Sequence, residues 1–134
     1  AGVDNTQSMG VSYLRWSEIF AGNGVINTSD ETLKTKLVDF TVKETCVAIK
    51  LKSLLKTFKW INSAEREESG GKKARVHVGI GAQSLGQAFI DEGLNPNDYA
   101  MFCYDEWEDI EGVESGNRYG VRLEQVLAFI IANT

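Results

Sequence analysis

The chain has 134 residues, of which 43% are apolar and 25% charged, so it can bury a hydrophobic core of its own. Its net charge of -5 excludes a protein that coats nucleic acid over its whole surface, although it leaves room for a local basic site. No apolar run approaches the roughly 20 residues of a membrane span, and we see no signal sequence. We therefore expect a cytoplasmic protein without membrane contact.

Residues 1–8 are small and polar and show no periodicity, so we interpret them as a flexible arm or a tag remnant. The remainder, residues 9–134, is expected to form one globular domain. Its first helix is predicted between Val11 and Phe20, where aromatic residues recur at helical spacing before a glycine-rich stop.

A long stretch without glycine or proline, Ser29 to Ile61, dominates the first half of the chain. Thr28 and Glu31 predict a capping box at its start. Apolar residues then recur at alternating spacings of three and four, interrupted only by Glu44, and this spacing favours helix: Leu33, Leu37, Phe40, Val47, Leu51, Leu54, Phe58 and Ile61.

One helix over this stretch would be roughly 50 Å long, whereas a compact chain of this size is roughly 36 Å across. We therefore predict two helices with a joint near Glu44, or one helix whose end another subunit covers. Two strands, Val38–Val42 and Val47–Leu51, are the alternative, because valine and threonine favour strands. The residues between those strands include no glycine, asparagine or aspartate for a hairpin turn, so we prefer helix.

The middle of the chain is predicted to contain a loop, a strand and a helix in that order. Residues 62–73 are polar and glycine-terminated, which indicates an exposed loop. Alternating apolar residues predict a short β element around Arg75–Gly81, with residues 24–26 as a candidate partner strand. A helix capped by Ser84 should follow and end at Gly93.

Two more helices are predicted in the last third. Asn95 as N-cap and Pro96 at the first helical position predict a helix that ends before Gly112. Frequent apolar residues predict another over residues 117–132. The fold class expected from the sequence is therefore mainly α, a compact multi-helix domain with a short β element; the strands described above give an α+β fold as the alternative.

Charge is unevenly distributed along the chain. Seven lysines lie between Lys34 and Lys59, whereas nine acids and no lysine or arginine lie between Asp91 and Glu114. Acids at the C-terminal end of a helix oppose its dipole by about 0.3–1 kcal/mol each, which suggests that a partner holds them. We predict that the partner is a second copy or a basic protein, and that these residues bind it: Asp105, Glu106, Glu108, Asp109, Glu111 and Glu114.

The basic segment supports an alternative function, the binding of single-stranded nucleic acid. In this segment, cations alternate with aromatic rings, as phosphate contact and base stacking require. The residues concerned are Lys50, Lys52, Lys56, Lys59, Trp60, Lys72, Lys73 and Arg75.

A second alternative is a small enzyme with an anion site at the turn between the predicted strand and helix, formed by Gly79, Gly81, Ser84 and Gly86. The spacing matches neither standard phosphate-binding fingerprint. His77 is the only histidine, and Cys46 and Cys103 lie too far apart for a metal-binding pair. We expect buried free thiols, no metal and no cofactor, and we name no catalytic residue.

No motif identifies a family. The function expected from the sequence is that of a non-enzymatic accessory protein that self-associates or binds a basic protein partner through its acidic segment.

Overall fold

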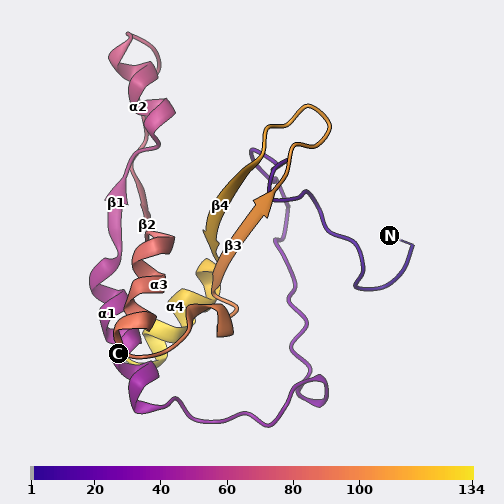
Figure 1. Ribbon diagram of the computed structural model, residues 1–134, viewed down its shortest axis with the longest axis vertical. Coiled ribbons are helices and arrows are strands. Elements are labelled where there is room, and N and C mark those ends of the chain that lie inside the picture. The colour runs from indigo at the N-terminus through magenta and orange to yellow at the C-terminus, as the bar shows by residue number, and fades with distance from the viewer. Residues whose placement is uncertain (1) are drawn as a thin grey trace. The chain divides into compact units, whose positions relative to one another are not determined.

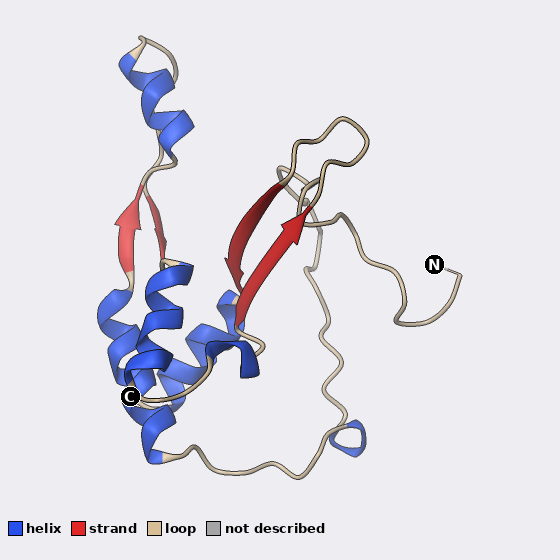
Figure 2. Cartoon of the chain, in the orientation of Figure 1, coloured by secondary structure: helices blue, strands red, loops and turns tan. Residues whose placement is uncertain are grey.

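The computed structural model describes residues 2–134, and in this part of the chain helices and strands are mixed (Figures 1 and 2). The prediction of a mainly α fold is wrong, because two two-stranded sheets lie among the helices. The α+β alternative placed its strands incorrectly, because Val47–Leu51 is helical. The elements in chain order are η1 (Glu31–Leu33), α1 (Val42–Leu54), β1 (Lys56–Phe58), α2 (Ile61–Glu68), β2 (His77–Gly79), α3 (Ala82–Asp91), η2 (Pro96–Asp98), β3 (Phe102–Trp107), β4 (Gly116–Val121) and α4 (Leu123–Ala132).

The chain divides into two compact units, which we describe separately. One unit comprises Phe40–Tyr104 and Tyr119–Thr134 and contains every α-helix of the described residues. The other comprises the described residues up to Asp39 together with Asp105–Arg118. Strands β3 and β4, which pair with each other, run from one unit into the other.

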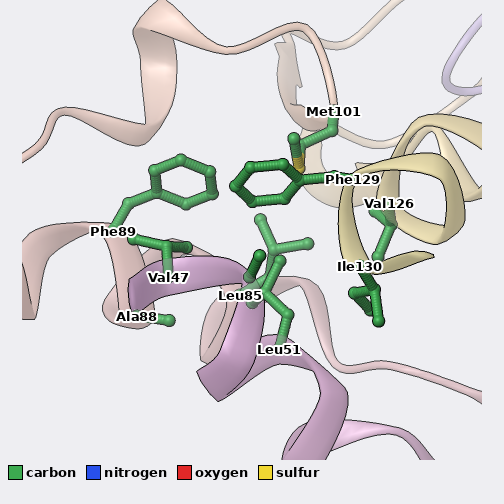
Figure 3. Packing of buried hydrophobic residues seen from close by; sticks show 10 residues of the cluster. Val47, Leu51, Leu85, Ala88, Phe89, Met101, Val126, Phe129 and Ile130 are labelled. Atoms are coloured by element: carbon green, nitrogen blue, oxygen red, sulfur yellow. The ribbon is translucent and has the colours of Figure 1, made fainter. Parts of the chain in front are cut away.

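The hydrophobic core of the helical unit lies between α1, α3 and α4 (Figure 3). Phe89 from α3 is fully buried, and its ring lies 4.5 Å from that of Tyr99 and 6.3 Å from that of Phe129, centre to centre. Helix α1 contributes Val47 and Leu51, both fully buried. Burying one such side chain stabilises the fold by about 1.5–3 kcal/mol, so this cluster fixes the three helices against one another.

Helix α1 begins at Val42, and a capping box explains why. The Thr41 hydroxyl accepts a hydrogen bond from the Glu44 backbone N–H, and the Glu44 carboxylate accepts one from the Thr41 N–H. The predicted joint near Glu44 is therefore the start of the helix. The capping box expected at Thr28 is replaced by Asp30, which caps the short η1 instead.

Residues 17–39, which we call the strap, form no helix or strand apart from η1. The helix predicted between Val11 and Phe20 is absent from the described chain, where an isolated bridge joins Val11 to Leu14. Apolar side chains of the strap are exposed to solvent, Phe20 at 91% and Ile26 at 96%. Of the predicted helical face only Tyr13 is half-buried, with its ring 6.0 Å from that of Trp107, and an apolar face that is not buried does little to stabilise a helix.

Residues 56–79 form an arm that projects from the helices of its unit, with α2 at its tip (Figure 1). Strands β1 and β2 make the neck of the arm and pair antiparallel, with Phe58 opposite His77 and Lys56 opposite Gly79. The β element predicted around Arg75–Gly81 is confirmed, but its partner is β1 and not residues 24–26. The predicted loop over residues 62–73 is wrong, because α2 occupies most of it.

Helix α3 ends where the sequence predicted. Gly93 has a φ of +76°, and the N–H groups of Gly93 and Leu94 donate to the carbonyls of Ile90 and Phe89. This is the Schellman arrangement, in which the left-handed position favours glycine.

The helix predicted from Asn95 is wrong. Asn95 does accept a hydrogen bond from the Asn97 N–H, but it caps only the short η2, and β3 follows. Ile110 and Val113 pair across a two-residue turn whose central residues, Glu111 and Gly112, both have positive φ. This geometry is typical of a type I′ hairpin turn. The helix predicted over 117–132 is confirmed only from Leu123 onward, because β4 precedes it.

Candidate functional site

Three aromatic rings gather at the neck of the arm, next to the start of α2. The ring of Phe58 stacks on that of His77 at 5.5 Å and meets the edge of Trp60 at 5.1 Å. Cross-strand pairing of Phe58 with His77 sets the stacked contact. Trp60 remains 59% exposed, so the cluster presents apolar surface to solvent at the neck of the arm.

Beside these rings lies a groove of about 540 Å³. Its floor includes Leu54 and Ile80, which also pack against the hydrophobic core. Gly79 lies close beneath Phe58, since a Cβ there would come within 3.2 Å of the ring. The groove is lined by Leu54, Lys56, Thr57, Phe58, Trp60, Gly79, Ile80, Gly81 and Ser84. We define these residues as the groove.

Three of the four residues predicted to bind an anion lie in this groove, namely Gly79, Gly81 and Ser84. Gly86 lies two residues after Ser84 in α3 and is buried, and a Cβ there would come within 2.9 Å of the Phe102 ring. Gly86 is therefore a packing residue, and its position does not fit the predicted site. Anion binding by the other three stays a prediction.

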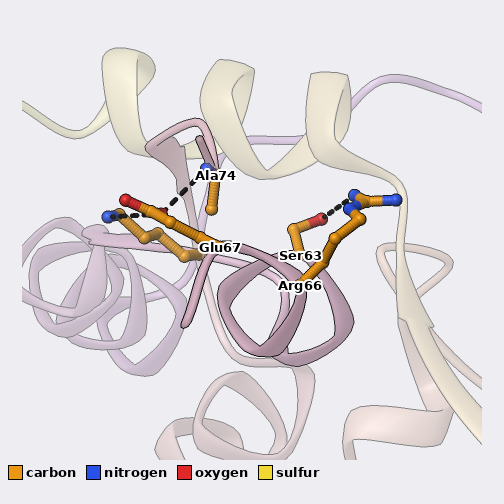
Figure 4. Close-up of polar contacts among 5 residues, drawn as sticks. Ser63, Arg66, Glu67 and Ala74 are labelled. Carbon is orange, nitrogen blue, oxygen red and sulfur yellow. Dashed lines mark hydrogen bonds and ion pairs between the residues drawn. The ribbon is translucent and has the colours of Figure 1, made fainter. Parts of the chain in front are cut away.

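Polar contacts at the tip of the arm tie α2 to the chain that returns toward β2 (Figure 4). The Glu67 carboxylate accepts a 2.8 Å hydrogen bond from the Ala74 N–H and lies 3.6 Å from the Lys59 ammonium. The pKa of Glu67 is lowered, chiefly by the Ala74 N–H and secondarily by Lys59. Arg66 donates to the Ser63 hydroxyl at 3.2 Å within the same helix.

The residues predicted to bind nucleic acid are divided between α1 and the arm. Lys50 and Lys52 lie on α1, whereas the other six belong to the arm. Within the arm, Lys59 is paired with Glu67, and Trp60 packs on Phe58.

The predicted acidic cluster lies on the β3–β4 hairpin and not at the end of a helix. Asp105 and Glu106 are in β3, and the other four lie between the strands. Asp109 accepts a 2.6 Å hydrogen bond from the Ser115 N–H, which gives one acid a role within the hairpin itself. The argument from the helix dipole is therefore wrong, because no helix is present at this place.

Both cysteines are free, as predicted, but the prediction that they are buried is wrong. Cys46 is exposed on α1, and Cys103 is half-buried, with an Arg122 nitrogen 3.1 Å from its sulfur. Across residues 2–134, no group of three or more histidine, cysteine or acidic side chains could hold a metal ion. None of the helices in the same range is long and apolar enough to span a membrane.

Comparison with known proteins gives consistent results. Residues 29–94 match the family described as "Chaperone of endosialidase". The chain is 29% identical to a tail spike protein of Escherichia virus K5 and 26% identical to the side tail fiber protein pb1 of Escherichia phage T5, over 91% and 95% of its length. It is also 30% identical to a solved structure described as a novel intramolecular chaperone, with a TM-score of 0.62, covering 78% of this chain and 93% of that one. The chain belongs to the chaperone of endosialidase family.

A second solved structure shares the fold of this family member. It is the carboxy-terminal domain of the phage T5 L-shaped tail fiber with its intramolecular chaperone domain, at a TM-score of 0.83 and 24% identity, covering 98% of this chain and 35% of that one. The chain spans only 20% and 10% of the two curated relatives named above.

Family membership corrects the functional predictions. The prediction of an accessory protein that binds a basic partner or single-stranded nucleic acid is wrong, because the chain belongs to a chaperone family. Its relatives are a tail spike protein, a side tail fiber protein and a solved intramolecular chaperone. Sequence reasoning also missed the groove floor and the strap. The available signal was the apolar content of residues 19–26 on both sides of a glycine-rich run, which was assigned instead to the end of a helix and to a candidate strand.

Proposed function

We propose that this chain is the intramolecular chaperone domain of a longer phage tail fiber or tail spike polypeptide. The observation that carries the proposal is the 30% identity to a solved intramolecular chaperone over 93% of that structure. In this role the domain promotes the folding and assembly of the polypeptide to which it is attached.

The distribution of apolar surface supports a chaperone role. Large exposed apolar patches mark interaction surfaces in soluble proteins. Here such surface includes the strap and the aromatic neck of the arm. The core between α1, α3 and α4 is formed by other residues, so the exposed surface is not required for the fold of the helical unit.

We also propose that the chaperone works as a homo-oligomer. The strap exposes apolar side chains, and covering them by other copies would remove that surface from water. Sedimentation of the purified chain over a range of concentrations tests this directly. A monomer at every concentration contradicts the proposal of self-association.

The chaperone role is tested on a fiber or spike polypeptide that carries the domain. The intact polypeptide is compared with a truncation that lacks residues 42–134 and with the variant Trp60→Ser. The measurement is the fraction of polypeptide recovered as soluble, protease-resistant fiber. We expect a large loss for the truncation and a partial loss for Trp60→Ser, whereas Ile131→Ser, another exposed apolar position, serves as the matched control. Equal recovery with and without residues 42–134 would falsify the proposal.

A further inference from the structure

We propose that the groove at the neck of the arm is a docking site for the acidic end of the strap, residues 17–33, of a second copy of this chain. The inference rests on the proposed function, since it names the partner of the exposed surfaces in the homo-oligomer.

The groove is built to receive apolar side chains. Leu54 and Ile80 in its floor continue the hydrophobic core outward, and Phe58 and Trp60 flank them with exposed ring surface. A volume of about 540 Å³ lies within the range of sites that take a small ligand or a few side chains.

The strap supplies side chains of the required kind. Ile26 and Phe20 are the two most exposed large apolar side chains among residues 2–134. The residues around them lie outside every helix and strand, and a bend at Gly22 and Asn23 separates Phe20 from Ile26. Each strand of the two-stranded neck has one unpaired edge, to which a segment outside any strand can add.

Charge complementarity between the arm and residues 17–33 supports the strap as the occupant. The arm, residues 56–79, carries six lysines and arginines against three glutamates. Residues 17–33 carry three acids, Glu18, Asp30 and Glu31, and no lysine or arginine. Lys56 lines the groove itself, so a positive charge lies next to the apolar floor. Opposite charges of this kind steer two copies together and disfavour docking of arm on arm.

Disulfide trapping between two distinguishable copies tests the proposal. In a background of Cys46→Ser and Cys103→Ala, one copy carries Val25→Cys and the other, with a different tag, carries Ser84→Cys. Both substitutions are small, and they keep Ile26, Phe20 and the aromatic rings. Two controls match them closely. Val38→Cys replaces Val25→Cys, since both valines are 84% exposed, and Ser53→Cys replaces Ser84→Cys on α1, outside the groove.

We expect the Val25→Cys and Ser84→Cys copies to form several-fold more mixed disulfide than either control pair under mild oxidation. Equal yields in a sample that sedimentation shows to be oligomeric would overturn the docking site but leave the proposed homo-oligomer intact. A monomeric sample would overturn both. A chain carrying both cysteines that links only to itself would also overturn the proposal, because the strap would then occupy the groove of its own copy.

Discussion

The Tyr99 hydroxyl donates a 2.7 Å hydrogen bond to the Glu44 carboxylate, joining residues 55 positions apart in the chain. The same carboxylate accepts the Thr41 N–H at 2.8 Å, so the first turn of α1 is fixed to the loop that precedes β3. The Tyr99 ring in turn packs on Phe89 in the core.

The first prediction concerns this hydrogen bond. We expect Tyr99→Phe to lower the free energy of unfolding by about 1–2 kcal/mol, because a hydrogen bond to a charged group is lost while the ring is retained. Urea denaturation followed by circular dichroism measures the change. Tyr119→Phe is the control, since it removes a hydroxyl from another half-exposed tyrosine of the same unit, and an equal loss there would contradict the assignment to Glu44.

The second prediction is the pH dependence of the same contact. The pKa of Glu44 is lowered from its ordinary value of 4.5, first by the Thr41 N–H and then by the Tyr99 hydroxyl. A carboxyl with a lowered pKa stabilises the fold above its ordinary pKa, and this contribution disappears as the pH falls through the lowered value. We expect the free energy of unfolding of the parent protein to decline below pH 4.5. The free energy of unfolding of Glu44→Gln should decline less steeply. Parallel curves for the two proteins would rule this out.

At alkaline pH the dependence has the opposite sign, and stability falls as the pH rises. Burial, with help from Glu44, raises the pKa of Tyr99 from 10 to about 12. A phenol with a raised pKa stabilises the fold below its ordinary pKa, and the contribution is lost as the pH rises from 10 through about 12. We expect Tyr99→Phe to lack this part of the alkaline decline in thermal denaturation. A full decline in the variant would show that other groups cause it.

The fourth prediction concerns the tip of the arm. Glu67→Gln leaves only a neutral acceptor for the Ala74 N–H and removes the ion pair with Lys59. We expect faster hydrogen exchange at the Ala74 amide. An exposed ion pair contributes little stability, so the Ala74 N–H is protected mainly by its hydrogen bond to the charged carboxylate. Glu68→Gln, its neighbour on α2, is the control. Exchange rates that are unchanged in Glu67→Gln would contradict the role given to this carboxylate.

The fifth prediction concerns packing at Gly86. A Cβ at this position would lie 2.9 Å from the Phe102 ring, so Gly86→Ala should force that ring to shift at a cost of about 1–3 kcal/mol. Adding Phe102→Leu to Gly86→Ala should restore part of the lost stability. Gly22→Ala is the control, since a Cβ there meets nothing within 4 Å. Thermal denaturation of the three variants measures the effect, and a Gly86→Ala variant as stable as Gly22→Ala would count against it.

Local signals predicted those elements whose ends are set by nearby residues. Gly93 ended α3 as expected because its left-handed position favours glycine, and the apolar run from Leu123 gave α4. The β element around Arg75–Gly81 was found from alternation alone.

Elements that depend on distant partners could not be predicted in this way. The residues of β3 are spaced as on an amphipathic helix, and β4 was needed to make them a strand. The turn at Glu111 and Gly112 lacks the usual asparagine or aspartate before glycine, so Gly112 was interpreted as a helix stop. The groove was likewise hidden, because residues from 54 to 84 meet there only after β1 and β2 have paired.

The neck of the arm has a mechanical consequence. Only three residue pairs, from Lys56 with Gly79 to Phe58 with His77, form the ladder between α2 and the helices of the unit. Bending of α2 against the helices behind the neck is therefore resisted by a handful of hydrogen bonds, whereas those helices are held together by a closed core. Loss of the ladder would let the arm swing while the core stays folded.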